Sequence, residues 1–140
     1  MKVNFKKLNE EAITPNYAHL GDAGLDLYSL EDYSLKPGEI KTFFLGFALE
    51  FTKEYVALVN DKGGRANVDH LHTLGGVFDS SYRGEYNVCL TNLGKNIFEI
   101  KKGQKIAQLL IVPITQAQLE EVEILSDTSR KEGRFGSTGG

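Results

Sequence analysis

The chain has 140 residues and one cysteine, and 19 acidic against 16 basic residues give it a net charge of −3. A domain of this size can bury a core without disulfides, and a single cysteine excludes an intrachain disulfide. The acidic balance argues against a general nucleic-acid-binding protein, although a locally basic site could still bind a small polyanion. No apolar run is long enough to cross a bilayer or to act as a signal peptide, so we expect a cytoplasmic single-domain protein without membrane partners.

Short apolar segments recur at intervals of roughly 8–12 residues and are separated by glycine and proline turn signals. We expect strands within residues 2–8, 25–28, 39–51, 55–59, 86–91, 97–100, 105–114 and 121–125. Residues 39–51 should hold two strands that are broken near Gly46. Only residues 66–71 and 116–121 look briefly helical. This pattern predicts an all-β fold, a jelly-roll-like sandwich or barrel.

The segment 106–114 is apolar on both faces except at Gln108. Such a strand is covered on both sides, and in so small a domain we expect a neighbouring subunit to supply the second cover. After Ser126 the chain becomes polar and glycine-rich, with Phe135 as its one large apolar residue. We therefore expect a β domain over residues 1–126 and a flexible C-terminal arm over residues 127–140.

The segment 75–85, GGVFDSSYRGE, is the first candidate for chemistry. Its paired glycines permit an unusual turn, and Asp79 and Tyr82 follow directly. We interpret it as a hairpin with a carboxylate at its mouth. The alternative is that Asp79 only caps a turn.

The tail 129–140 sets Arg130, Lys131 and Arg134 beside several glycines. Consecutive N–H groups of glycine-rich turns suit phosphate oxygens, and arginine adds bidentate donors. Phe135 has no core to join and could stack on a flat ligand. The alternative is a disordered linker.

Three further segments carry weaker signals. Gly63 and Gly64 lie between Lys62 and Arg65, which also fits a solvated turn. Asp26 lies in an apolar stretch, where a carboxylate needs an ion-pair partner or a metal. Gln108 must bond either a ligand or the main chain. One more candidate, a metal site, would use Asp69, His70 and His72, because alternate histidines on a strand point the same way.

Taken in order, the segments 23–29, 61–66, 75–85, 103–111 and 129–140 resemble the five motifs of the homotrimeric dUTPase family. The resemblance implies a β jelly-roll trimer whose active sites take motifs from more than one subunit. It also implies an arm that closes over the nucleotide, and hydrolysis of dUTP to dUMP and pyrophosphate with Mg²⁺ as cofactor.

The resemblance also implies a role for each matching residue. Asp79 would deprotonate the attacking water, Tyr82 would pack under the deoxyribose, and Asp26 would help to hold the hydrated magnesium ion. Five residues would contact the base: Gly76, Val77, Phe78, Asn87 and Phe135. Thr73 would lie near the sugar. The phosphates would be bound by Lys62, Gly63, Gly64, Gln108, Arg130, Gly136 and Ser137.

Three positions depart from the family pattern. Lys62, Gly63 and Gly64 replace the usual Arg-Ser-Gly, Thr73 replaces a frequent asparagine, and Lys131 replaces a glycine. These changes leave open a nucleotide-sensing regulatory module without efficient catalysis. A dCTP-deaminase-like function is disfavoured, because the glutamate that deamination requires would stand at Cys89.

Overall fold

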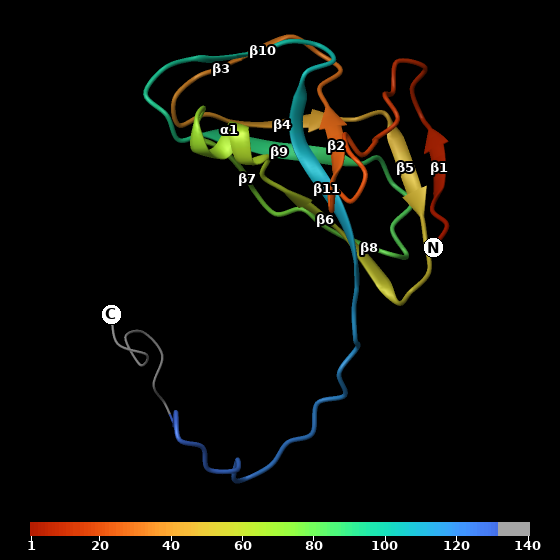
Figure 1. Ribbon diagram of the computed structural model, residues 1–140, viewed down its shortest axis with the longest axis vertical. Coiled ribbons are helices and arrows are strands. Elements are labelled where there is room, and N and C mark those ends of the chain that lie inside the picture. The colour runs from red at the N-terminus through yellow and green to blue at the C-terminus, as the bar shows by residue number, and fades with distance from the viewer. Residues whose placement is uncertain (132–140) are drawn as a thin grey trace.

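The computed structural model describes residues 1–131, and the described part is almost entirely β-structure (Figure 1). The single short helix of this part is α1 (Gly63–Asn67). The strands are β1 (Asn4–Lys7), β2 (Leu25–Tyr28), β3 (Tyr33–Leu35), β4 (Ile40–Phe44), β5 (Phe47–Glu50), β6 (Tyr55–Asn60), β7 (Leu71–Thr73), β8 (Val77–Asp79), β9 (Asn87–Asn92), β10 (Phe98–Ile100) and β11 (Lys105–Pro113).

Two larger antiparallel sheets carry the fold, one with the strand order β2-β11-β6-β8 and the other with the order β4-β9-β7. The pairs β1-β5 and β3-β10 flank them. Alternation along β9 aims Val88 and Leu90 into the core, where both are buried, together with Leu27, Phe43 and Leu109 from the other strands. The architecture confirms the predicted all-β jelly-roll-like fold.

Glycines at positive φ make the turns that the sequence suggested. Gly38 (φ 74°) separates β3 from β4, and Gly46 (φ 71°) separates β4 from β5. L-amino acids with a side chain rarely adopt this conformation, so glycine sets where each strand ends. The two strands predicted within residues 39–51 are confirmed.

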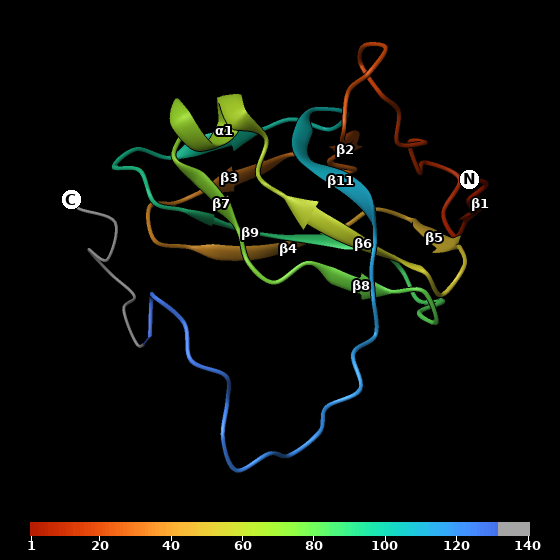
Figure 2. The ribbon, with the colours of Figure 1, turned by 60° about the horizontal axis from the view of Figure 1, so that its bottom comes forward.

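Three local predictions are wrong in part or in full. The helix expected at residues 66–71 lies earlier, at Gly63–Asn67, and Leu71 already begins β7. Residues 121–125 form no strand and residues 116–121 form no helix. The chain leaves the body after β11 and extends away from it (Figures 1 and 2). No strand of the described part lies beside this segment to pair with it, and an isolated short helix is unstable in water.

The extended segment carries large apolar side chains into solvent. Leu119, Ile124 and Leu125 are 93%, 84% and 83% exposed. Side chains of this kind are normally covered by a partner surface. Within residues 1–131 no helix is long and apolar enough to cross a membrane.

Candidate active site

The strands β8 and β9 part from each other, which corrects the predicted hairpin. β8 pairs with β6 at the edge of one sheet, whereas β9 pairs with β4 and β7 in the other. Asn87 pairs with Phe44 on β4, and β7 reaches only as far back along β9 as Leu90. β8 and Asn87 therefore share no ladder, and no described strand pairs with the outer edge of β8. Main-chain N–H and C=O groups at such an edge are the kind that can bind a planar base.

Gly76 brings this edge close to β6. Its main chain is at φ 97°, and an added Cβ atom would stand 2.8 Å from the carbonyl oxygen of Val59. The Gly76 carbonyl accepts a hydrogen bond from the Val59 N–H at 2.8 Å. Any larger residue would push β8 away from β6.

Asp79 ends β8, and its side chain is exposed. Among residues 1–131 no group forms a hydrogen bond or an ion pair with its carboxylate, so both oxygens can accept a proton from a water molecule. The Asp79 carbonyl oxygen accepts a hydrogen bond from the Tyr82 N–H at 3.0 Å, which makes the tight turn that presents the carboxylate. Asp79 thus bonds the turn through its main chain, not through a side-chain cap.

Tyr82 lies over the end of this turn. Its hydroxyl donates to the Glu85 carbonyl oxygen at 3.1 Å, and its ring packs 5.6 Å from Phe78 between centroids. Phe78 stacks in turn on the buried Tyr86 at 4.3 Å, and Tyr86 stacks on Phe47 at 5.4 Å. This aromatic stack anchors the predicted sugar platform to the core.

Tyr86 has a hydroxyl without a hydrogen-bond partner in the described part of the chain. Burial, opposed in part by Arg83 and reinforced by Tyr82, raises the pKa of Tyr86 to about 12. The hydroxyl thus stays protonated at physiological pH. Tyr86 stabilises the protein through the packing of its ring.

Asp26 in β2 is buried, with 2% of the residue exposed, and two lysines neutralise it. Lys62 Nζ donates to Oδ1 at 2.5 Å. Lys105 Nζ lies 2.6 Å from Oδ2 as an ion pair, although Oδ2 has no partner with hydrogen-bond geometry in residues 1–131. Burial alone would raise the pKa of Asp26, but Lys105 and Lys62 outweigh it and hold that pKa below the ordinary value. Two ammonium groups against one carboxylate leave a net positive charge, which suits a polyanion.

Gln108 lies opposite Asp26 in the β2–β11 ladder. Its Nε2 donates a hydrogen bond to the main-chain carbonyl oxygen of Asp61 at 2.8 Å. This bond uses one of the two N–H groups of the amide, and the second remains available for a ligand. Its Oε1 occupies the space beside Gly24, where an added Cβ atom would stand 2.4 Å away. The amide is therefore held in one orientation.

Asp61 is a site residue that the sequence did not single out. Its Oδ1 accepts from the N–H and the hydroxyl of Thr73 at 2.6 and 2.7 Å, and its Oδ2 lies 2.7 Å from His72 Nδ1. Burial alone would raise the pKa of Asp61, but the hydrogen bonds from His72 and Thr73 prevail and lower it. The only sequence signal was an aspartate next to Lys62.

Gly63 and Gly64 begin α1, which Lys62 precedes as the N-cap residue. An added Cβ atom at either glycine meets no atom within 4 Å, so the chain faces open space there. Arg65 pairs with Asp69 at 2.6 Å and lies 5.3 Å over the ring of Phe98. Arg65 thus ties the helix to β10.

The possible metal site at Asp69, His70 and His72 is not assembled. Asp69 binds Arg65, and His72 binds Asp61. His70 adopts φ 57° at the start of β7, so the two histidines do not follow one regular strand. Residues 1–131 contain no cluster of three or more acidic, histidine or cysteine side chains that could hold a metal ion.

Among the described residues of the chain, the candidate residues form two groups. Asp79 pairs with Val56 at the start of β6, whereas Gln108 pairs with Asn60 at its end. Four residues of strand separate these points by about 13 Å. Asp26, Lys62, Lys105 and Gln108 form the basic group, and Asp79 and Tyr82 form the turn group. Arg130 lies in the extended segment, while Phe135, Gly136 and Ser137 lie outside the described residues.

A sequence profile of the dUTPase family matches residues 10–139. The chain belongs to the dUTPase family. It is 47% identical over 137 residues to the deoxyuridine 5'-triphosphate nucleotidohydrolase of Clostridioides difficile, covering 96% of this chain and 95% of that protein. The enzyme of the same name from Nautilia profundicola is 46% identical over 141 residues, with 99% of each chain covered.

Solved structures of the dUTPase family share the fold. A mutant dUTPase of Staphylococcus bacteriophage 80alpha with dUpNHpp superposes with a TM-score of 0.90 at 30% identity, covering 99% of this chain and 98% of that one. A mutant dUTPase from phage phi11 of S. aureus, described for its coordination of a structural Mg(II) ion, gives a TM-score of 0.82 at 26% identity, covering 91% and 100%.

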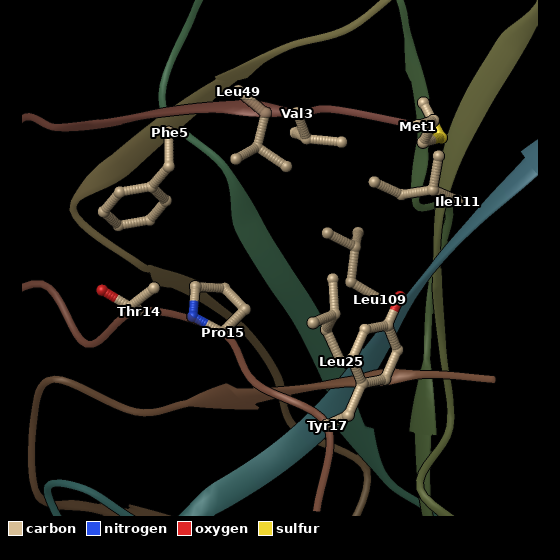
Figure 3. Close-up of a pocket in the computed structure, with 10 residues that line it drawn as sticks. All are labelled: Met1, Val3, Phe5, Thr14, Pro15, Tyr17, Leu25, Leu49, Leu109 and Ile111. Atoms are coloured by element: carbon tan, nitrogen blue, oxygen red, sulfur yellow. The ribbon is translucent and has the colours of Figure 1, made fainter. Parts of the chain in front are cut away.

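The chain also has an apolar pocket of about 360 Å³, which is lined by other residues (Figure 3). Side chains from β1, β2, β5 and β11 and from the segment before β2 line it, among them Phe5, Pro15 and Leu109. None of the candidate site residues lines it, and its apolar walls offer nothing to a triphosphate. The pocket is therefore not the nucleotide site.

Proposed function

We propose that this protein hydrolyses dUTP to dUMP and pyrophosphate, which limits uracil incorporation into DNA and supplies dUMP for thymidylate synthesis. The nearly full-length match to nucleotidohydrolases supports this function. The single observation that carries it is the combination of an Asp79 carboxylate that has no partner among residues 1–131 with a basic group fixed on buried Asp26. This combination also favours hydrolysis over a regulatory module, because binding alone does not require a base.

The reaction needs positioning and charge stabilisation more than covalent chemistry. Asp79 orients and deprotonates the water that attacks the α-phosphorus. Lys62, Gln108 and the N–H groups of Gly63 and Gly64 bind the phosphate chain, whose charge the basic group balances.

Recognition of the base and sugar falls to the turn group. The main chain of Gly76, Val77, Phe78 and Asn87 reads uracil, and cytosine is rejected because its donors and acceptors are exchanged. Tyr82 packs under the deoxyribose and leaves no room for a 2′-hydroxyl, while Thr73 lies beside the sugar. Arg130, Phe135, Gly136 and Ser137 close over the nucleotide as a C-terminal arm.

We propose that Mg²⁺ is the cofactor and that Asp26 would help to hold a hydrated ion bound by the triphosphate. A magnesium ion keeps several waters and needs one or two carboxylates besides phosphate, and buried Asp26 fits such an outer contact better than a resident metal site. When bound, the ion neutralises the charge that develops on the phosphate oxygens. Lys62 and Lys105 already pair with Asp26, so an ion would contact this carboxylate through water.

We also propose a homotrimer with shared active sites. The distance of about 13 Å between the two groups along β6 supports this arrangement, since groups from two subunits can approach more closely than the ends of one strand. The exposed apolar residues after β11 support it as well, because they need a covering surface. The cytoplasmic location stays a prediction.

The decisive experiment measures pyrophosphate release in the presence of Mg²⁺ from dUTP, dCTP, dTTP and UTP. Release from dUTP alone would support the reaction, the base selectivity and the exclusion of ribose together. Asp79→Asn should bind dUTP and lose turnover, and full turnover in that variant would refute the proposed base. Tight dUTP binding without release by the wild type would instead favour the nucleotide-sensing alternative.

A further inference from the structure

Asp61 lies in the loop before α1 and makes contacts with two strands of the fold, β7 and β11. Its carboxylate accepts two hydrogen bonds from Thr73 on β7, at 2.6 and 2.7 Å. Its carbonyl oxygen accepts the amide of Gln108 on β11 at 2.8 Å. It directly precedes Lys62, whose ammonium reaches Asp26 on β2 at 2.5 Å. One residue thus connects β7, β11 and the loop that begins α1.

Asp61 contacts two residues that the proposed function uses, Thr73 and Gln108, and it also contacts His72. It is the chain neighbour of a third such residue, Lys62, and the inference rests on that function. Thr73 lies beside the sugar, while Gln108 and Lys62 bind phosphate. Each of them could adopt several rotamers if left alone. The bonds to Asp61 select one orientation of the Thr73 hydroxyl and of the Gln108 amide, and they fix the main chain from which Lys62 projects.

The chemistry of the Thr73 contact has a direct consequence for the ligand. An ionised carboxylate only accepts hydrogen bonds, so the Thr73 hydroxyl proton is committed to Asp61. Toward a nucleotide the Thr73 oxygen can then only accept. The low pKa of Asp61 keeps this polarity throughout the physiological range.

We propose that Asp61 is a positioning residue, which holds Lys62, Thr73 and Gln108 in the geometry that binds the sugar and phosphates without touching the nucleotide itself. Nucleotide binding then draws on side chains that are already ordered, so less conformational entropy is lost. The competing explanation is a clamp that only stabilises the fold.

The test compares Asp61→Ala and Asp61→Asn with a matched control, Asn92→Ala. The Asn92 side chain is buried and makes three hydrogen bonds at 2.9 Å, to Leu35, Gly94 and Asn96, none of which belongs to the proposed site. Removing it should lower the unfolding temperature without altering the nucleotide site. The measurements are the unfolding temperature, and KM and kcat for dUTP well below that temperature.

We expect Asp61→Ala to raise the KM for dUTP about tenfold, in line with losing charge-assisted hydrogen bonds, and to change kcat much less. Asp61→Asn keeps an oxygen for Thr73 but loses the charge, so its KM should rise about threefold. Asn92→Ala should keep the wild-type KM although its unfolding temperature falls.

The inference would be overturned if Asp61→Asn, and Asp61→Ala where that variant folds, kept the wild-type KM. It would also be overturned if KM rose equally in Asn92→Ala. Failure of the proposed function is separate, because it would appear as absence of pyrophosphate release in the wild-type protein. Asp61→Asn keeps the test decisive if Asp61→Ala does not fold.

Discussion

An added Cβ atom at Gly84 would stand 2.3 Å from the hydroxyl oxygen of Tyr82. The ring of Tyr82 therefore occupies space that only glycine leaves free. Because that ring also stacks near Phe78 and bonds the Glu85 carbonyl oxygen, the position of the sugar platform depends on the residue two places further along the chain.

Replacing Gly84 with alanine should displace Tyr82 and weaken the exclusion of ribonucleotides. We expect the ratio of kcat/KM for dUTP over UTP to fall at least about tenfold, because a displaced ring makes room for a 2′-hydroxyl. Steady-state kinetics with both nucleotides measure it. Tyr82→Phe is the control, since it keeps the ring and should keep most of the discrimination; an unchanged ratio in Gly84→Ala would contradict the platform role.

A serine at position 63 should be tolerated and should raise kcat for dUTP. The position faces open space, and the hydroxyl would restore the family's contact with the phosphate chain. We expect an increase of a few-fold, the size of one added hydrogen bond to a charged group. Gly76→Ser is the matched control, because its Cβ atom would stand 2.8 Å from the Val59 carbonyl oxygen and should lower the unfolding temperature. A fall in kcat in Gly63→Ser would show that the glycine is itself required.

The sequence predicted most of the strands, because alternation and turn glycines are local signals. It missed β3 and β7, which are only three residues long. Val88 and Leu90 alternate as the core requires, and Gly38 and Gly46 stand where the chain turns. The parting of β8 from β9 was not predictable, because strand pairing depends on partners far along the chain. Residues 121–125 look like a strand locally, yet no described strand lies beside them.

The site was predicted as far as residue types carry it. The apolar neighbours of Asp26 were enough to predict that it is buried. They could not show whether it pairs with a cation or binds a metal, because its partners Lys62 and Lys105 are distant in sequence. Asp61 was missed because its contacts to Thr73 and Gln108 arise only from the fold. Lys131 stands where the family usually has a glycine, and its main chain adopts φ 47°. Glycine adopts this conformation readily, which accounts for the usual residue, but nothing in the structure explains the lysine.

The ion pairs of Asp26 should make the protein sensitive to acid. The pKa of Asp26 in the folded state lies below its ordinary value of 3.8, so the stabilisation is complete above about pH 4 and is lost as the pH falls through the folded value. Asp26→Asn should lower the free energy of unfolding by about 2 kcal/mol at neutral pH, since the lysines are partly exposed. Urea unfolding of both proteins should show this difference shrinking below pH 4; a difference that is constant down to pH 2 would contradict the ion pairs.

The ring of Tyr86, not its hydroxyl, should support the site. Tyr86→Phe keeps the stack between Phe78 and Phe47 and removes a buried hydroxyl without a partner in the described chain, so stability should stay equal or rise by about 1 kcal/mol. Tyr86→Leu loses the stack and should cost about 3 kcal/mol. Denaturant unfolding measures both. A large loss in Tyr86→Phe would mean that the hydroxyl bonds a buried water.

Two truncations should separate assembly from catalysis. Cutting the chain after Ser126 removes Arg130 and Phe135 but keeps the exposed apolar residues Leu119, Ile124 and Leu125. If these residues are covered by a neighbouring subunit, this variant should remain trimeric by light scattering and lose most of its turnover. Cutting after Pro113 removes them as well and should dissociate the trimer, because its apolar contacts are lost. A trimer that survives the second truncation would place the interface elsewhere on the body, and full turnover after the first would exclude a catalytic role for the arm.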